Sequence, residues 1–181
     1  MTPRTSDGVP YLVRAIRPDD AARERAFINS LSPQSRYQRF MHNLREASDA
    51  LIEKFVTVDQ HCTMALVAVV GEGEQQRIIG VARYAADDDE SCEFAVAVAD
   101  DFQCRGIGTT LVPLLFEHAA RAGFKTIYGT VLADNQRMIE LARWLGLTVD
   151  TPQAGEVTVR AWRTLVTAPH EGTARSRVPR S

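Results

Sequence analysis

Three short apolar runs, separated by turn residues, constrain the fold of this chain most strongly. They span residues 62–70, 77–84 and 91–98, and their lengths and β-branched residues are typical of strands. Gly71-Glu-Gly-Glu and the acidic stretch 87–90 stand between them and have the composition of turns. Because such short connections join antiparallel neighbours, the three runs predict consecutive antiparallel strands.

Helices and further strands are predicted on both sides of these runs. In chain order they are a strand over 11–16, helices that begin after Asp19, at Ser32-Pro33 and after Ser48, a helix over 106–122, a strand over 126–131, a helix over 134–145 and a hairpin of 147–150 with 156–165. This order predicts an α/β (α+β) fold, in which a mixed and mostly antiparallel sheet carries helices on its faces.

Length and composition are those of one globular domain. The 181 residues are 45% apolar and 24% charged. We expect a flexible N-terminus over 1–10, a single domain over 11–166 and a disordered tail over 167–181, where no core pattern is visible.

The same composition excludes several classes of protein. A net charge of -2 argues against a nucleic-acid partner. The longest apolar stretch, Met64–Val70, is far shorter than the ~20 residues of a membrane span. Three cysteines without a CxxC pair argue against a disulfide framework or a cysteine zinc site, and no metal is predicted. We therefore expect a soluble, cytoplasmic protein with neither a membrane nor a nucleic-acid partner.

The segment Gln103-Cys-Arg-Gly-Ile-Gly108 has the composition of a phosphate-binding loop. It follows a predicted strand and opens a helix, whose first N–H groups have no internal partner and whose dipole is positive there. Gly106 and Gly108 allow an anion to approach the backbone closely, and Arg105 adds a cation. The dinucleotide fingerprint fails because Leu111 occupies its third position, whereas the acyl-CoA pattern Q/R-x-x-G-x-G/A matches in full. The alternative is a tight turn that binds nothing.

This loop, with the strand before it and the helix after it, closely resembles the acetyl-CoA motif of the GNAT superfamily of N-acetyltransferases. The run from Leu132-Ala-Asp-Asn to Gly146-Leu resembles the second motif of that superfamily. Leu31–Phe40, Met64–Ala68 and Glu93-Phe-Ala-Val are similar to Pat-type protein lysine acetyltransferases, and the likeness spans about residues 11–165. The resemblance implies the GNAT fold.

The resemblance also implies that acetyl-CoA is the co-substrate and that an amine attacks its thioester directly. The pantetheine would pair with the strand as another strand does, and a free N–H around Val98 would stabilise the thioester oxygen. Asn135 would help to hold the pantetheine, or would only cap the next helix. The implied cofactor-binding residues are Val96, Ala97, Val98, Gln103, Cys104, Arg105, Gly106, Ile107, Gly108, Thr109 and Asn135.

Glu93 is the candidate catalytic residue, as general base. It is the only acid within the apolar strand core 92–99, where burial would raise its pKa toward neutrality because desolvation disfavours the charged form. By resemblance it also matches the catalytic glutamate of the Pat-type proteins. The alternative is a half-exposed glutamate paired with Arg83 or Arg163. The tyrosine that many GNAT enzymes use as general acid is replaced by Ala142.

The sequence does not identify the amine that accepts the acetyl group. The resemblance favours a protein lysine, possibly on an acyl-CoA synthetase, and the alternatives are a small amine or a non-catalytic acyl-CoA-binding module. Arg36, Tyr37 and Arg39 could line the acceptor side or form a solvated helix face. The acidic turn 87–90 could attract a cationic lysine or be an ordinary solvated turn.

Overall fold

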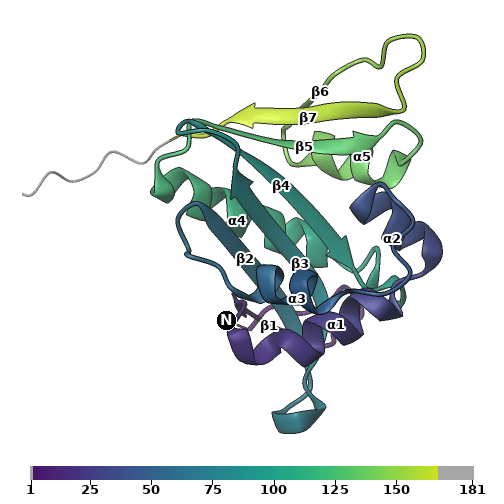
Figure 1. Cartoon of the computed structure of the whole chain (residues 1–181), viewed down its shortest axis with the longest axis vertical. Helices are drawn as coiled ribbons and strands as arrows, with labels where there is room; N and C mark the ends of the chain where they lie inside the picture. Colours follow the sequence, from purple (N-terminus) through teal and green to yellow (C-terminus); the bar gives the residue numbers. More distant parts are fainter. Residues whose placement is uncertain (1, 167–181) are drawn as a thin grey trace, which may run out of the picture.

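A seven-stranded sheet organises residues 2–166, the part of the chain that the computed structural model describes. The strand order is β1-β2-β3-β4-β5-β7-β6 (Figure 1). The strands are β1 (Leu12–Ala15), β2 (Thr63–Val70), β3 (Arg77–Ala86), β4 (Ser91–Val98), β5 (Thr126–Leu132), β6 (Thr148–Val149) and β7 (Thr158–Thr164). Only β4 and β5 pair in parallel among these strands. The predicted mixed and mostly antiparallel sheet is confirmed.

Five α-helices of the described range flank the sheet. They are α1 (Ala21–Ser30), α2 (Pro33–Phe40), α3 (Asp49–Val56), α4 (Ile107–Ala122) and α5 (Gln136–Trp144). Helices α1 and α3 cover one face of β2 and β3, while α4 and α5 lie on the opposite face (Figure 1). None of these helices is long and apolar enough to cross a membrane.

Strand β2 contributes to an apolar core on each face of the sheet. Leu66 and Ala68 belong to the core under α4, whereas Ala65 and Val67 belong to the core under α1 and α3. A strand buried on both faces needs apolar residues at nearly every position, which explains the continuous apolar run that the sequence shows here.

The helix starts predicted at Ser32-Pro33 and after Ser48 are confirmed. Ser32 and Ser48 cap α2 and α3, since their hydroxyls accept from the N–H of Ser35 (3.1 Å) and of Leu51 (3.2 Å). The predicted cap at Asp19 is wrong. A single 3₁₀ turn over Pro18–Asp20 precedes α1, and the buried Asp20 carboxylate accepts from the N–H of Arg17 at 3.0 Å.

The structure describes the N-terminal segment of the chain but not the last residues. Residues 2–10, for which flexibility is predicted, fold back on themselves and contact the loop before α4. Thr5 is buried, and the N–H of Ser6 donates to the carbonyl of Arg105 at 3.1 Å. The predicted disordered tail, 167–181, lies outside the described residues.

Strands β4 and β5 pair only where they begin. Their register joins Ser91–Glu93 to Thr126–Tyr128, but both strands continue beyond these residues. A Cβ at Gly129 would lie 3.0 Å from the Phe94 ring and 3.1 Å from the Phe94 carbonyl, so a larger residue would require Phe94 to shift. Beyond this contact the two strands separate, and the next residues of each line an opening in the sheet.

Candidate functional site

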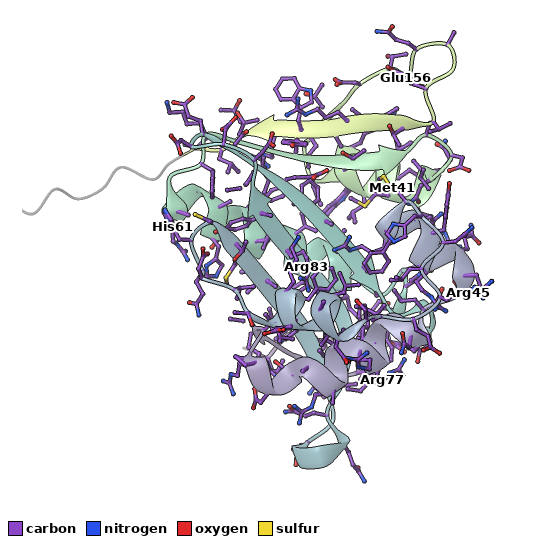
Figure 2. The ribbon with its side chains drawn as sticks, in the orientation of Figure 1. Met41, Arg45, His61, Arg77, Arg83 and Glu156 are labelled. Atoms are coloured by element: carbon purple, nitrogen blue, oxygen red, sulfur yellow. The ribbon has the colours of Figure 1, made fainter. Side chains whose placement is uncertain are left out.

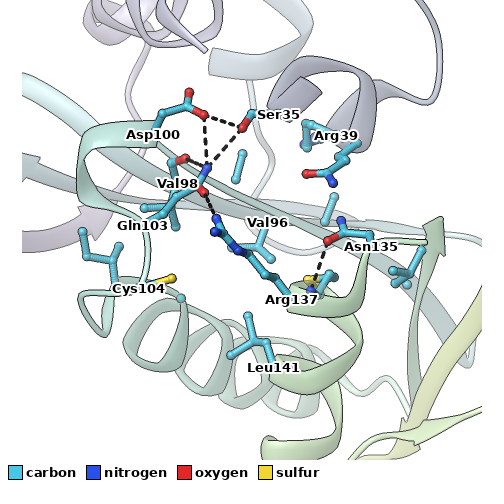
Figure 3. Close-up of a pocket in the computed structure, with 18 of the residues that line it drawn as sticks. Ser35, Arg39, Val96, Val98, Asp100, Gln103, Cys104, Asn135, Arg137 and Leu141 are labelled. Atoms are coloured by element: carbon cyan, nitrogen blue, oxygen red, sulfur yellow. Dashed lines mark hydrogen bonds between the residues drawn. The ribbon is translucent and has the colours of Figure 1, made fainter. Parts of the chain in front are cut away.

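The separation of β4 and β5 opens a cavity of about 590 Å³ (Figure 3). Its walls are the second halves of β4 and β5, the loop and first turn of α4, the start of α5 and one side of α2. The predicted residues that line it are Val96, Ala97, Val98, Gln103, Cys104, Gly106, Ile107, Gly108, Thr109 and Asn135. The structure thus brings together residues from distant parts of the sequence, with Arg105 as the one predicted binding residue outside the lining.

The backbone of β4 presents hydrogen-bonding groups to this cavity. The N–H of Ala99 donates to the carbonyl of Ile79 on β3 at 2.9 Å. Because successive peptide groups of a strand point in opposite directions, Val96 and Val98 direct theirs away from β3, into the opening left by β5. The Val98 carbonyl accepts from the Gln103 amide at 3.3 Å, which agrees with this direction. An extended ligand could therefore pair with β4 in the place of a strand.

The first turn of α4 forms one end of the cavity. Gly106 precedes the helix with φ +86°, a conformation that favours glycine. In the described part of the chain no side chain caps this end, and the hydroxyls of Thr109 and Thr110 bond back to the Gly106 carbonyl at 2.8 and 3.1 Å. The uncapped N–H groups and the positive helix end are suited to a phosphate.

Two arginines near this helix end differ from the sequence-based expectation. Arg105 does not line the cavity. Instead it forms an ion pair with Asp7 at 2.6 Å and lies over the ring of Phe102. Arg137 of α5, which the sequence analysis did not single out, lines the cavity and donates to the Gln103 side chain at 3.1 Å. Its position two residues after Asn135, inside the second motif, is the signal that could have found it.

A polar network ties α2 to the loop before α4 (Figure 3). The Asp100 carboxylate accepts from the N–H and hydroxyl of Ser32, both at 2.9 Å, and from the hydroxyl of Ser35 at 2.7 Å. The Gln103 amide donates to Ser35 at 3.1 Å. Although burial opposes it, these hydrogen bonds lower the pKa of Asp100. The sequence gives no sign of this network beyond the position of Asp100 just after a strand.

Asn135 caps α5, which is one of the two roles considered for it. Its side-chain oxygen accepts from the N–H of Met138 at 3.2 Å and so caps α5. The residue also lines the cavity, so capping does not remove it from the site.

Glu93 lies at the edge of the cavity, but the predicted burial is wrong because its side chain is exposed. It is the last residue of β4 that pairs with β5. The hydroxyl of Thr130, which lines the cavity, donates to Glu93 Oε1 at 2.7 Å. The alternative ion pairs are not formed, since Arg83 binds Glu24 and Arg163 binds the carbonyl of Leu145.

No general acid stands at the position that the sequence analysis examined. Ala142 is fully buried. Tyr128, which pairs with Glu93 across β4 and β5, donates to Asp87 at 2.9 Å. Burial together with this hydrogen bond raises the pKa of Tyr128 to about 12. A phenol held this way releases its proton poorly near neutral pH.

The three candidate acceptor residues of α2 have different surroundings. Arg36 donates to main-chain carbonyls, among them that of Leu31 at 3.0 Å, and so holds the loop around α2. Tyr37 is exposed at the surface. Arg39 lines the cavity. Only Arg39 is thus placed to meet a molecule inside the site.

The acidic turn 87–90 is largely occupied by local contacts. Asp87 accepts from Tyr128, Asp88 accepts from the N–H groups of Glu90 and Ser91, and Glu90 pairs with Lys125. These contacts favour a structural role for most of the turn. Among the side chains that the structure describes, no group of three or more His, Cys, Asp or Glu is placed to hold a metal.

Comparisons with known proteins agree with this geometry. Residues 22–147 match the model of the acetyltransferase (GNAT) family. Acetyltransferase PA5475 of Pseudomonas aeruginosa is 42% identical over 141 residues, which cover 77% of this chain and 76% of that protein. Acetyltransferase Pat of Mycolicibacterium smegmatis is 30% identical over 138 residues, which cover 75% of this chain but 40% of that longer protein.

A solved structure extends the similarity to three dimensions. The crystal structure of the GNAT domain of S. lividans PAT superimposes with a TM-score of 0.82 at 26% identity. The match covers 91% of this chain and 96% of that domain.

Proposed function

The chain belongs to the acetyltransferase (GNAT) family and is an acyl-CoA-dependent acetyltransferase, and we propose that it acetylates lysine side chains of proteins. In this proposal acetyl-CoA is the donor and Glu93 the general base. The observation that carries it is the opening between β4 and β5, with the uncapped end of α4 on one side and Glu93 at its edge.

The donor would lie along β4. Its pyrophosphate would accept from the N–H groups of the first turn of α4, with Arg137 close by. Its pantetheine amides would pair with the free backbone groups of Val96 and Val98. This placement carries the thioester along β4 toward Glu93.

The transfer is a direct displacement. The neutral amine attacks the thioester carbonyl, so a C–N bond forms and the C–S bond breaks. A free lysine with a pKa of about 10.4 arrives protonated at neutral pH, so its ammonium proton first passes to the Glu93 carboxylate, directly or through a water. The second proton, which the nitrogen carries once the C–N bond has formed, is lost to solvent as the thiolate leaves. A backbone N–H of β4 that faces the opening and is not paired with the pantetheine would stabilise the oxygen that gains charge in the transition state.

The leaving group is the CoA thiolate. A thiol has a pKa of ~8.5, so the thiolate departs without help and then takes a proton from solvent. This fits the buried alanine at position 142, which offers no proton.

The position of Glu93 suits a base that meets its substrate from solvent. Thr130 binds Oε1 and leaves Oε2 free for the amine. Because Glu93 is exposed in the protein alone, the acceptor and the acetyl group would be what shields it from water during transfer.

The assignment of protein lysine rests on similarity. Three stretches of the sequence resemble Pat-type protein lysine acetyltransferases, and both Pat comparisons cover most of this chain. The chain spans less than half of the Mycolicibacterium protein, so partners or regulation of that whole protein are not assigned to this one.

The test is CoA release from acetyl-CoA with two acceptor sets, lysine-bearing proteins that include an acyl-CoA synthetase, and a panel of small amines. We expect turnover on proteins, with the acetyl group located on lysine side chains by mass spectrometry. Turnover on small amines alone would contradict the protein assignment. Acetyl-CoA binding without turnover on either set would instead support a non-catalytic binding module.

A further inference from the structure

Arg39 projects a cation at the acceptor side of the cavity without a partner for it. The residue lies on α2, and Asn135, which caps α5, lines the same cavity (Figure 3). Its guanidinium carbon is 4.9 Å from the centroid of the Phe40 ring and 5.8 Å from that of Phe55. Among the side chains that the structure describes, no carboxylate lies within 4.0 Å of this guanidinium, and no described group forms a hydrogen bond with it. The side chain is therefore held by stacking alone.

The acids that could neutralise Arg39 do not form an ion pair with it. Glu24 is fully buried and forms an ion pair with Arg83 at 2.8 Å. Arg83 lies on β3 beside α3, with its guanidinium carbon 3.8 Å from the Phe55 ring (Figure 2). Glu93 is not within ion-pair distance of Arg39, and in the proposed function its carboxylate receives the proton of the amine. The Phe55 ring thus lies near two guanidinium groups, of which only the Arg83 group has a carboxylate partner.

The electrostatics of this cluster favour an incoming anion. Burial and the neighbouring charge of Arg83 lower the pKa of Arg39 to about 10, while Glu24 and Glu93 act in the opposite direction. The guanidinium remains charged near neutral pH. A partly buried cation beside a like charge is unfavourable until an anion joins it, and a guanidinium binds a carboxylate through two parallel hydrogen bonds.

We infer that Arg39 binds a carboxylate of the acceptor, so that the acceptor is an amine that carries a carboxylate within reach. This inference rests on the proposed role of Glu93, since it places the amine at Glu93 and the carboxylate at Arg39. Two sources offer this chemistry. One is a free amino acid, and the other is a protein lysine with an acidic residue beside it.

Acceptor pairs that differ only in the carboxylate test the inference. For the free source, the pair is Nα-acetyl-lysine and its amide, which share one reactive amine. For the protein source, the pair is a Lys-Asp peptide and the same peptide with Lys-Asn. Each is titrated by calorimetry into CoA-saturated protein, and kcat and KM are measured for each with acetyl-CoA.

The variants are Arg39→Gln, Arg39→Lys and, as a matched control, Arg45→Gln. Arg45 is exposed on the segment after α2, outside the cavity lining (Figure 2). We expect the wild-type protein to bind the carboxylate member of at least one pair about tenfold more tightly, as the loss of one charge-assisted contact implies. Arg39→Gln should abolish this difference through KM, Arg39→Lys should keep part of it, and Arg45→Gln should keep all of it.

The outcomes separate this inference from the proposed function. Equal affinity within both pairs would overturn the inference, while peptide acetylation would leave the proposed function intact. A preference found only for the free amino acid, with no peptide acetylated, would support the inference and overturn protein acetylation. If Arg39→Gln weakened both members of a pair equally, Arg39 would be a structural residue that stacks on Phe40 and Phe55, and the inference would fail.

Discussion

Gly106 sets the direction in which the chain enters α4, and its conformation can be tested by a single substitution. A side chain at φ +86° is strained by about 1 kcal/mol or more. We expect Gly106→Ala to lower the free energy of unfolding by about that amount and to weaken acetyl-CoA binding, because the loop must shift at the phosphate end. Chemical denaturation and calorimetry with acetyl-CoA measure the two effects.

Gly108→Ala is the milder comparison for this prediction, because the acyl-CoA pattern Q/R-x-x-G-x-G/A accepts alanine at this position although Gly108 lines the cavity. Gly108 lies within α4, and a Cβ there would meet only Leu141 Cδ2, at 3.2 Å. The end of a leucine side chain can move by a few tenths of an ångström, so acetyl-CoA binding should be nearly retained. If both variants bound acetyl-CoA as tightly as the wild-type protein, the loop would not have the role assigned to it.

For single residues, the sequence predicted which of them lie at the site but not always the direction of their side chains. Gln103, Gly106 and Gly108 lie where the motif placed them because spacing along one loop decides their positions. Arg105 was misplaced because its partner, Asp7, is 98 residues away in the chain. The burial predicted for Glu93 rests on its apolar neighbours in the sequence. Neighbouring residues of a strand point to opposite faces of the sheet, however, and the side chain of Glu93 is exposed on its own face.

Among the α-helices of the described residues, α2 alone has no buried residue. The network around Asp100 ties its first turn to the loop before α4. Elements with few buried contacts open at a low free-energy cost. We expect Asp100→Ala to change the global free energy of unfolding by about 1 kcal/mol or less. We also expect it to speed hydrogen–deuterium exchange of the α2 amides and to raise the acceptor KM.

Asp101→Ala is the neighbouring control, since Asp101 pairs with Arg77 at the surface and not with α2. Unchanged exchange of α2 in Asp100→Ala would show that the network does not hold this helix.

Strands and helices were predictable because their signals are local. Hairpin partners β2, β3 and β4 follow from apolar runs with short turns, and Ser32 and Ser48 cap their helices as predicted. The free backbone groups near Val98 were expected only from the resemblance, because the strands separate beyond a contact between Phe94 of β4 and Gly129 of β5. A contact between residues that distant leaves no periodic pattern in the sequence.

At the scale of the whole molecule, the ion pairs of Asp20 join the edge strand β1 to helix α1. The fully buried carboxylate lies 2.6 Å from Arg14 of β1 and 3.4 Å from Arg23 of α1. Burial raises its pKa, but hydrogen bonds from Arg14 and the N–H of Arg17 outweigh burial, and the net pKa is below its ordinary value of 3.8. The contribution of Asp20 to the free energy of unfolding is therefore fully present above its ordinary pKa of 3.8. This contribution is lost as the pH falls through the lowered pKa of the folded protein.

We therefore expect Asp20→Asn to lower the free energy of unfolding at pH 7 by about 2–3 kcal/mol. The variant should also lose less stability than the wild-type protein as the pH falls below 3.8. Urea denaturation across this pH range measures both effects, with the exposed Asp19→Asn as control. Parallel stability–pH curves for Asp20→Asn and the wild-type protein would show that this group does not carry the dependence.

The most direct test of the central claim is single-turnover acetyl transfer from the preformed acetyl-CoA complex to a lysine acceptor. The proteins compared are the wild type, Glu93→Gln and Glu53→Gln, whose Glu53 is exposed on α3 outside the cavity lining. Loss of a general base should slow transfer by about 10²- to 10⁴-fold in Glu93→Gln, with acetyl-CoA affinity unchanged and Glu53→Gln behaving as the wild type. Transfer at the wild-type rate in Glu93→Gln would contradict the assignment of the base.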